Sequence, residues 1–251
     1  MRILLISDIH SNIQGLEACL AAAPPYDSAV NLGDLVGYGA SPNEVIEQSR
    51  QLGHVFVRGN HDRVVCGLVS VKDFNPVAGL AALWTRDQLS SDNLEWLRGL
   101  PQGPIQINDV PGAQFVHGSP LNEDDYVISE VDATAPLTMS SQPLTFFGHT
   151  HLQGGFLSDE NGTEFFQPTY STVGESESCE LALEDGQRYM INPGSVGQPR
   201  DGDWRAGFAM FDTETKVVTF YRVPYDVRGA QDRIIAANLP VRLATRLAAG
   251  K

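Results

Sequence analysis

The chain has 251 residues, 42 % of them hydrophobic, and a formal net charge of −14 at pH 7. A chain of this length can bury a substantial core, so we predict a single domain over residues 1–251. The negative charge offers no attraction for a nucleic-acid backbone, which excludes a long nucleic acid as an expected partner.

Strands and helices alternate over the first 60 residues. Short apolar runs predict strands, and apolar residues at helical spacing, such as Ile13, Leu16 and Leu20, predict the helices between them. Strands that alternate with helices form largely parallel sheets. We place His54 at the corner between the second helix and the third strand. The expected elements are a strand at 2–7, a helix at 12–23, a strand at 28–32, a helix at 42–52 and a strand at 54–58.

The rest of the chain predicts further helices around a second set of strands. Residues 75–100 predict two helices with a break near Ser90 and Ser91, and 228–248 predict two short helices split at Pro240. The polar stretches 122–143 and 168–178 are expected to be loops, which either gate a site or simply cross the surface. A second sheet is implied by the expected strands 104–107, 113–117, 144–147, 154–157, 163–167, 179–184, 188–192, 206–211 and 217–222.

The cysteines and the N-terminal residues predict a cytoplasmic protein. Cys19, Cys66 and Cys179 are far apart and form no C-x-x-C motif, so neither a disulfide framework nor a zinc knuckle is expected. The apolar run after Arg2 is too short for a signal peptide or a membrane span, so no membrane association is expected.

Most of the histidines lie in short blocks that also contain aspartate or asparagine. Each block lies at or beside the end of a predicted strand, where side chains can converge at one edge of a sheet. A single histidine of this kind is more often an ordinary polar residue at the end of a strand, with no metal-binding role. The whole set together indicates a metal centre. Residues two apart on an extended strand point to the same side, which would bring each pair of ligands in a block together. The blocks are Asp8-Ile9-His10, Gly33-Asp34, Gly59-Asn60-His61-Asp62, His117-Gly118 and Gly148-His149-Thr150-His151.

These blocks resemble the signature of the calcineurin-like metallophosphoesterase superfamily, D-x-H, G-D, G-N-H-[DE], a lone H, and G-H-x-H, over roughly residues 1–200. The resemblance implies an α/β fold in which two packed mixed β-sheets are flanked by helices. It also implies that Asp34 bridges two metal ions and that His61 is the proton donor or transition-state stabiliser. The remaining implied ligands are Asp8, His10 and His151 for one ion, and Asn60, His117 and His149 for the other.

The ligand set predicts two divalent transition-metal ions. Mixed nitrogen and oxygen ligands with a bridging carboxylate suit Mn²⁺, our first choice, and Fe, Ni, Co or Zn ions better than Ca²⁺. Paired ions lower the pKa of a shared water and hold the phosphoryl oxygens during in-line attack. We therefore expect a metal-bridging hydroxide to attack the phosphoester. The chain's negative charge also makes bound cations necessary near a phosphorylated substrate.

The block that begins with Gly33-Asp34 and runs to Gly39 differs from the corresponding block of the protein Ser/Thr phosphatases in this superfamily. Their G-D-x-V-D-R-G block supplies an Asp for the catalytic histidine and an Arg for phosphate, whereas this chain has Gly37 and Tyr38 there. The block instead resembles small bacterial phosphodiesterases that are often labelled similar to diadenosine tetraphosphatases. A phosphoprotein substrate is therefore disfavoured, and whether a carboxylate orients His61 is left open.

Further candidates for substrate contact lie near these blocks. Asn192–Arg200 also recurs in that bacterial group, either as a tight turn or as a substrate-binding segment, and Arg200 is the candidate for a phosphate contact. Tyr38 could stack on a base or only pack. Arg58 and Arg63 are weaker candidates that we expect to form surface salt bridges.

The sequence thus predicts a metal-dependent phosphodiesterase that acts on a small phosphoester, possibly a nucleotide. The alternatives are a phosphomonoesterase, and a scaffold that has kept the fold without turnover, as the retromer subunit resembling this superfamily has. That subunit lacks parts of the ligand set, whereas this chain has all seven predicted ligands and His61. The oligomeric state is left open.

Overall fold

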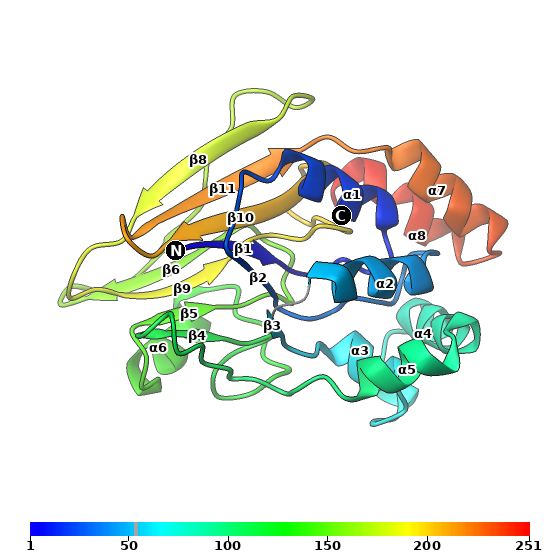
Figure 1. Cartoon of the computed structure of the whole chain (residues 1–251), viewed down its shortest axis with the longest axis horizontal. Helices are drawn as coiled ribbons and strands as arrows, with labels where there is room; N and C mark the ends of the chain where they lie inside the picture. The colour runs from blue at the N-terminus through cyan, green and yellow to red at the C-terminus, as the bar shows by residue number, and fades with distance from the viewer. Residues whose placement is uncertain (53–54) are drawn as a thin grey trace.

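Two mixed β-sheets pack face to face in the computed structural model, which describes residues 1–52 and 55–251 (Figure 1). The strand order in the first sheet is β3 (Val55–Phe56), β2 (Ser28–Asn31), β1 (Arg2–Ile6), β10 (Ala206–Asp212), β11 (Val217–Val223) and β8 (Glu177–Ala182). In this sheet β1 is parallel to β2, and β2 is parallel to β3, while β10, β11 and β8 continue it with antiparallel pairing.

The second sheet is also mixed. Its strand order is β4 (Ala113–Phe115), β5 (Leu144–Phe146), β9 (Arg188–Asn192), β6 (Gly154–Asp159) and β7 (Gly162–Phe166). The strands β4, β5 and β9 are parallel, and β6 and β7 extend the sheet with antiparallel pairing. The predicted fold class, two packed mixed sheets flanked by helices, is confirmed.

The alternation of side chains along β1 explains the layers. Ile3 and Leu5 belong to the cluster between the two sheets, where they join Phe115 and Phe146 of the second sheet. Leu4 and Ile6 belong to the cluster on the opposite face, against the helices. Successive residues of a strand point to opposite faces, so one strand serves two cores.

The helices cover the outer faces of both sheets (Figure 1). The outer face of the second sheet is covered by α6 (Glu130–Met139), whose Ala133 and Leu137 pack with Phe147 and Phe156. All the other α-helices contribute to the cluster against the first sheet. They are α1 (Ile13–Ala22), α2 (Pro42–Leu52), α3 (Asn60–Val65), α4 (Pro76–Gln88), α5 (Ser91–Arg98), α7 (Val227–Ala236) and α8 (Val241–Thr245), with short 3-10 helices at Val71–Asp73 and Leu247–Ala249.

The structure corrects several element predictions. Residues 104–107 form no strand; Ile105 makes only an isolated bridge to Phe115. The predicted loop 122–143 contains α6, which begins where Ser129 and Asp132 cap each other's backbone N–H groups. This Ser-x-x-Asp capping box was a readable signal, but few apolar residues follow it at helical spacing.

The third polar block, Gly59-Asn60-His61-Asp62, and the strand before it also differ from the prediction. β3 covers only Val55–Phe56, and Asn60–Val65, which we did not assign to a helix, forms α3. His54, which we placed at the preceding corner, lies outside the described residues. The break near Ser90 is confirmed, since the Ser90 hydroxyl caps α5 by accepting a hydrogen bond from Asn93 N. Within the described residues, we find no helix with the length and apolar character needed to cross a bilayer.

Candidate metal centre

The polar blocks meet at one edge of the two sheets because they follow parallel strands. Asp8, Asp34 and Asn60 come after β1, β2 and β3, while His117 and His149 come after β4 and β5. The carboxyl ends of parallel strands lie at the same edge, so blocks that are up to 141 residues apart come into contact. The predicted convergence therefore occurs, and it uses both sheets.

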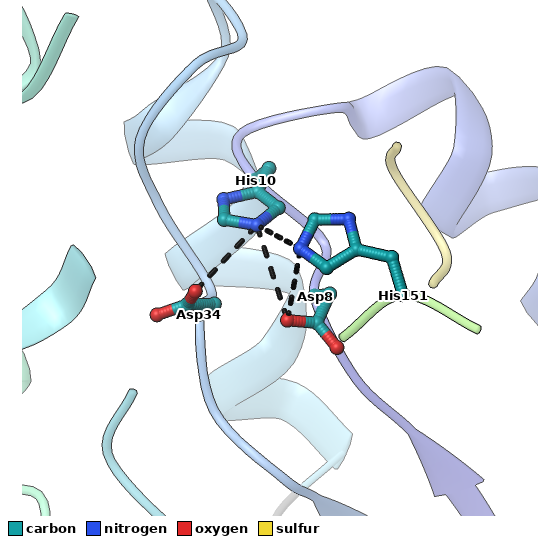
Figure 2. A group of neighbouring side chains, drawn as sticks. All are labelled: Asp8, His10, Asp34 and His151. Atoms are coloured by element: carbon teal, nitrogen blue, oxygen red, sulfur yellow. Dashed lines mark hydrogen bonds and ion pairs between the residues drawn. The ribbon is translucent and has the colours of Figure 1, made fainter. Parts of the chain in front are cut away.

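The first group of potential ligands is Asp8, His10, Asp34 and His151, all of them buried (Figure 2). The Nε2 atoms of His10 and His151 lie 3.1 Å apart. An Asp8 carboxylate oxygen lies 3.3 Å from His151 Nε2, and Asp34 Oδ2 lies 3.6 Å from His10 Nε2. Two nitrogens and two carboxylates therefore face a common point, as a transition-metal site requires.

The second group is Asp34, His117 and His149. His117 Nε2 lies 3.4 Å from Asp34 Oδ2, 3.1 Å from His149 Nδ1 and 3.2 Å from Asn60 Oδ1. Asp34 is common to both groups, and its Oδ2 is the atom that faces both His10 and His117. The arrangement can thus hold two cations with one shared carboxylate.

Hydrogen bonds outside the centre fix which nitrogen of each imidazole faces inward. His10 Nδ1 lies 3.1 Å from the Val36 carbonyl, His117 Nδ1 lies 2.8 Å from the Leu32 carbonyl, and His151 Nδ1 lies 2.6 Å from the Gln198 carbonyl. A carbonyl can only accept, so each Nδ1 carries a proton, and the neutral His10 and His151 present the lone pair of Nε2 to the centre. The close Nε2 atoms of His10 and His151 are then two acceptors facing each other, an arrangement that a bound cation would stabilise.

The comparisons with known proteins agree with this geometry. A model of the calcineurin-like phosphoesterase superfamily domain matches residues 1–216. The chain belongs to this superfamily. The resemblance of the sequence blocks is therefore confirmed, and α7 and α8 lie beyond the matched residues.

Full-length relatives of this superfamily member come from bacteria and archaea. It is 40 % identical to a metallophosphoesterase of Sphaerobacter thermophilus, whose crystal structure superposes with a TM-score of 0.83 over 100 % of this chain and 99 % of that one. An uncharacterized protein of Methanocaldococcus jannaschii is 34 % identical over 99 % of this chain and 98 % of its own length. A hypothetical protein of Pyrococcus horikoshii, 21 % identical, shares the fold with a TM-score of 0.78 over 100 % and 98 % of the two chains.

Left-handed backbone conformations place the ligands, in contrast to our expectation of extended strands. Asp8 and His10 have φ values of 53° and 49°, and His149 and His151 have 69° and 62°. β1 ends at Ile6 and β5 at Phe146, so neither pair lies on a strand. Such conformations each cost about 1–3 kcal/mol and cluster at functional sites. The predicted residues meet, but turns rather than strand alternation bring them together.

Glycines let the chain approach Asp34 closely. A Cβ on Gly59 would lie 2.0 Å from Asp34 Oδ1, and Gly33 has a φ of 103° with His117 Nδ1 2.7 Å from where its Cβ would be. Any other residue at these two positions would displace the shared carboxylate or the imidazole. The glycines of the blocks are thus required by the geometry of the centre.

His61 lies beside the centre, and no carboxylate of the described residues pairs with its side chain. Its backbone N–H donates to Asp34 Oδ1 at 2.9 Å, while its buried Nδ1 has no hydrogen-bond partner among the described residues. Its ring packs against Tyr38 and Phe74, with ring centroids 4.4 and 4.7 Å away. Asp62 instead accepts from backbone N–H groups of neighbouring loops. Aromatic packing, and not a carboxylate, therefore orients the His61 ring.

The remaining sequence candidates are divided between the site and the surface. Tyr38 lies against His10 as well as His61, with a centroid distance of 4.7 Å to His10. The Arg200 side chain donates to the Tyr126 hydroxyl at 3.3 Å and to Gln198 Oε1 at 3.1 Å. Arg58 and Arg63 form ion pairs with Glu123, as expected, and Arg63 also pairs with Asp124.

Two groups near the centre were not predicted from the sequence. Tyr126 packs on His149 with a centroid distance of 4.0 Å. Arg246 lies 5.8 Å from the Tyr38 ring centroid, although it is separated from Tyr38 by most of the chain. Neither belongs to a recognisable motif, and only the tertiary structure brings them to the site. A pocket of about 450 Å³ opens beside Asn60, His61 and His149.

The charges of the centre balance one another in the metal-free protein. Burial alone would raise the pKa of Asp34, but His117 and His61 hold it well below its usual range. Burial opposes a charge on His117, yet Asp34 and Asp8 raise the pKa of His117 to about 9. Burial also raises the pKa of Asp8 to about 7 and lowers that of His149 to about 3. A proton on His117 thus provides the positive charge that a metal ion would provide.

We expect divalent cation binding to release protons. Because His117 is protonated below pH about 9, a cation at the second group must displace that proton, and affinity should rise about tenfold per pH unit between pH 7 and 9. Below about pH 7 protonated Asp8 should steepen the dependence. Calorimetric titration with Mn²⁺ in buffers of different ionisation enthalpy measures the released protons. No proton release at pH 8 would contradict this expectation.

Proposed function

We propose that this protein is a metal-dependent phosphodiesterase that hydrolyses a small phosphoester, possibly a nucleotide, with two divalent transition-metal ions. The observation that carries the proposal is the shared carboxylate, since Asp34 Oδ2 faces one histidine of each ligand group. We take Mn²⁺ as the preferred ion, the cytoplasm as the location, and the small bacterial phosphodiesterases as the branch. The single-domain organisation over 1–251 remains part of the proposal.

The proposal assigns each ligand by the group in which it lies. Asp8, His10 and His151 would hold one ion, Asn60, His117 and His149 the other, and Asp34 both. When bound, such ions supply an activated water and neutralise the phosphoryl oxygens.

His61 would donate a proton or hydrogen bond to the leaving oxygen. Burial lowers the pKa of His61 to about 4, so its imidazole is neutral at pH 7 and carries one N–H. The ring is held by Tyr38 and Phe74 and lines the pocket beside Asn60. Its position fits a group that acts on the substrate without binding metal, and Arg200 would contact a phosphate group of the substrate.

The pocket supports a diester rather than a monoester. Its volume of about 450 Å³ exceeds that of a phosphate ion, so a second ester group has space.

The test compares two chromogenic substrates on the Mn²⁺-loaded protein. We expect kcat/KM for bis(p-nitrophenyl) phosphate to exceed that for p-nitrophenyl phosphate by at least about tenfold, or about 1.4 kcal/mol in transition-state stabilisation. Apo protein treated with a chelator is the control and should be inactive. A preference for the monoester would favour the phosphomonoesterase alternative, and no turnover of either would favour a non-catalytic scaffold.

A further inference from the structure

Three arginines gather beside Tyr38, next to the candidate metal centre. The guanidinium groups of Arg200 and Arg246 lie 5.9 and 5.8 Å from the centroid of the Tyr38 ring. Together with Arg242 they line a pocket of about 230 Å³, which Leu243 of α8 and Val77 and Ala78 of α4 also line. Both helices lie at the helical end of the molecule (Figure 1). Arg200 follows β9, whereas Arg242 lies in α8 and Arg246 is the C-cap residue of α8.

Among the described residues, no Asp or Glu side chain pairs with any of these three arginines. Arg200 donates only to the neutral Tyr126 and Gln198, and its buried Nε has no partner. Arg246 donates to the Lys251 carbonyl. Elsewhere Arg58, Arg63, Arg205 and Arg222 are all ion-paired, in a chain that has 31 acidic and 17 basic residues. Within the part of the chain that the structure describes, Arg86 and Arg188 also lack an acidic partner, but backbone carbonyls accept from their guanidinium groups. This pocket differs in that three such arginines line one cavity.

Adjacent positive charges without an anion are unfavourable. Burial, followed by the neighbouring Arg200 guanidinium, lowers the pKa of Arg246 below its usual value. The N-terminus of α4, a helix of 13 residues, adds the partial positive charge of its first turn. An anion bound in the pocket would offset all of these charges. Arginine is the side chain best suited to a phosphoryl group, because its planar fork matches two phosphate oxygens.

The arginine pocket adjoins the pocket of the metal centre. Both are lined by Tyr38, Asn75 and Ala78, and Tyr38 itself touches His10 and His61. A single ligand can therefore extend from one pocket into the other. The two pockets together would accept two anionic groups joined by a short connection.

We propose that Arg200, Arg242 and Arg246 bind a second phosphoryl group of the substrate, so that the substrate class is a small compound with at least two phosphoryl groups. One phosphoryl group occupies the metal centre and is cleaved, and the other is held by the arginines. This inference rests on the proposed function, because it assumes that the first group reacts at the metal centre. The arginines bind and orient the substrate and do not take part in the chemical step.

The test measures pyrophosphate binding to the metal-free full-length protein by calorimetry at fixed ionic strength. We expect the wild type to bind pyrophosphate, and Arg242→Gln/Arg246→Gln to bind it at least about tenfold more weakly, because two charge-assisted contacts are lost. Arg2→Gln/Lys216→Gln is the matched control, since it removes the same charge at the opposite ends of the strands. The control should bind as the wild type does.

A single substitution tests whether the double variant loses binding only because it misfolds. Arg242 is exposed, so Arg242→Gln should keep the thermal midpoint and still weaken binding about threefold or more. The proposal is overturned by a wild type that does not bind pyrophosphate, by an unchanged double variant, or by malonate binding as tightly as pyrophosphate. Turnover plays no part in this measurement, so failure of the phosphodiesterase assay and failure of the arginine pocket are distinguished.

Discussion

Replacing His61 with alanine should lower kcat by about two orders of magnitude or more and leave the metal content nearly unchanged. The imidazole lines the pocket and is not part of either ligand group. The contact of residue 61 with the shared carboxylate is made by its backbone N–H, which the substitution retains. The variant therefore removes a proton donor without removing a ligand.

Two measurements on His61→Ala separate its role from a structural one. Metal analysis of the purified variant should give the wild-type content, and steady-state kinetics on bis(p-nitrophenyl) phosphate should show the loss in kcat. Because the lost group is the donor to the leaving oxygen, a substrate with a better leaving group should lose less activity. Wild-type turnover in the variant would refute the assigned role.

Asp34→Asn should weaken the binding of both ions together. One carboxylate oxygen faces His10 of the first group and His117 of the second, so a single loss of charge acts on both sites. Groups that only support metal ligands typically change affinity about 10- to 100-fold, and a shared ligand should reach at least the upper value. Calorimetric titration with Mn²⁺, together with elemental analysis, measures the two affinities.

Asp8→Asn is the matched comparison for Asp34→Asn. It is the same change of a buried carboxylate to an amide, but Asp8 belongs to one ligand group only. We therefore expect one ion to be weakened in Asp8→Asn and both in Asp34→Asn. If Asp34→Asn lost only one ion, the shared role of Asp34 would be wrong.

Much of the centre was predictable because its residues are local in the sequence. Asp8-Ile9-His10, Gly59-Asn60-His61 and Gly148-His149-Thr150-His151 each combine ligand types with glycine or a preceding apolar strand. Parallel strands must deliver such blocks to one edge, so convergence followed from the order of elements. The local backbone was not predictable in the same way. The left-handed turns at Asp8 and His149 cost energy at any residue other than glycine and persist because the surrounding structure holds them.

The sequence by itself determined the superfamily, the two-sheet fold class and the set of residues that gather at the centre. Only the tertiary structure decided that aromatic rings rather than a carboxylate hold His61, and that Arg242 and Arg246 line a pocket with Tyr38. The reason is physical. Periodicity and short motifs report which residues share a strand or a turn. The packing of α8 and of the short 3-10 helix after it depends instead on long-range burial of apolar residues such as Leu243 and Leu247.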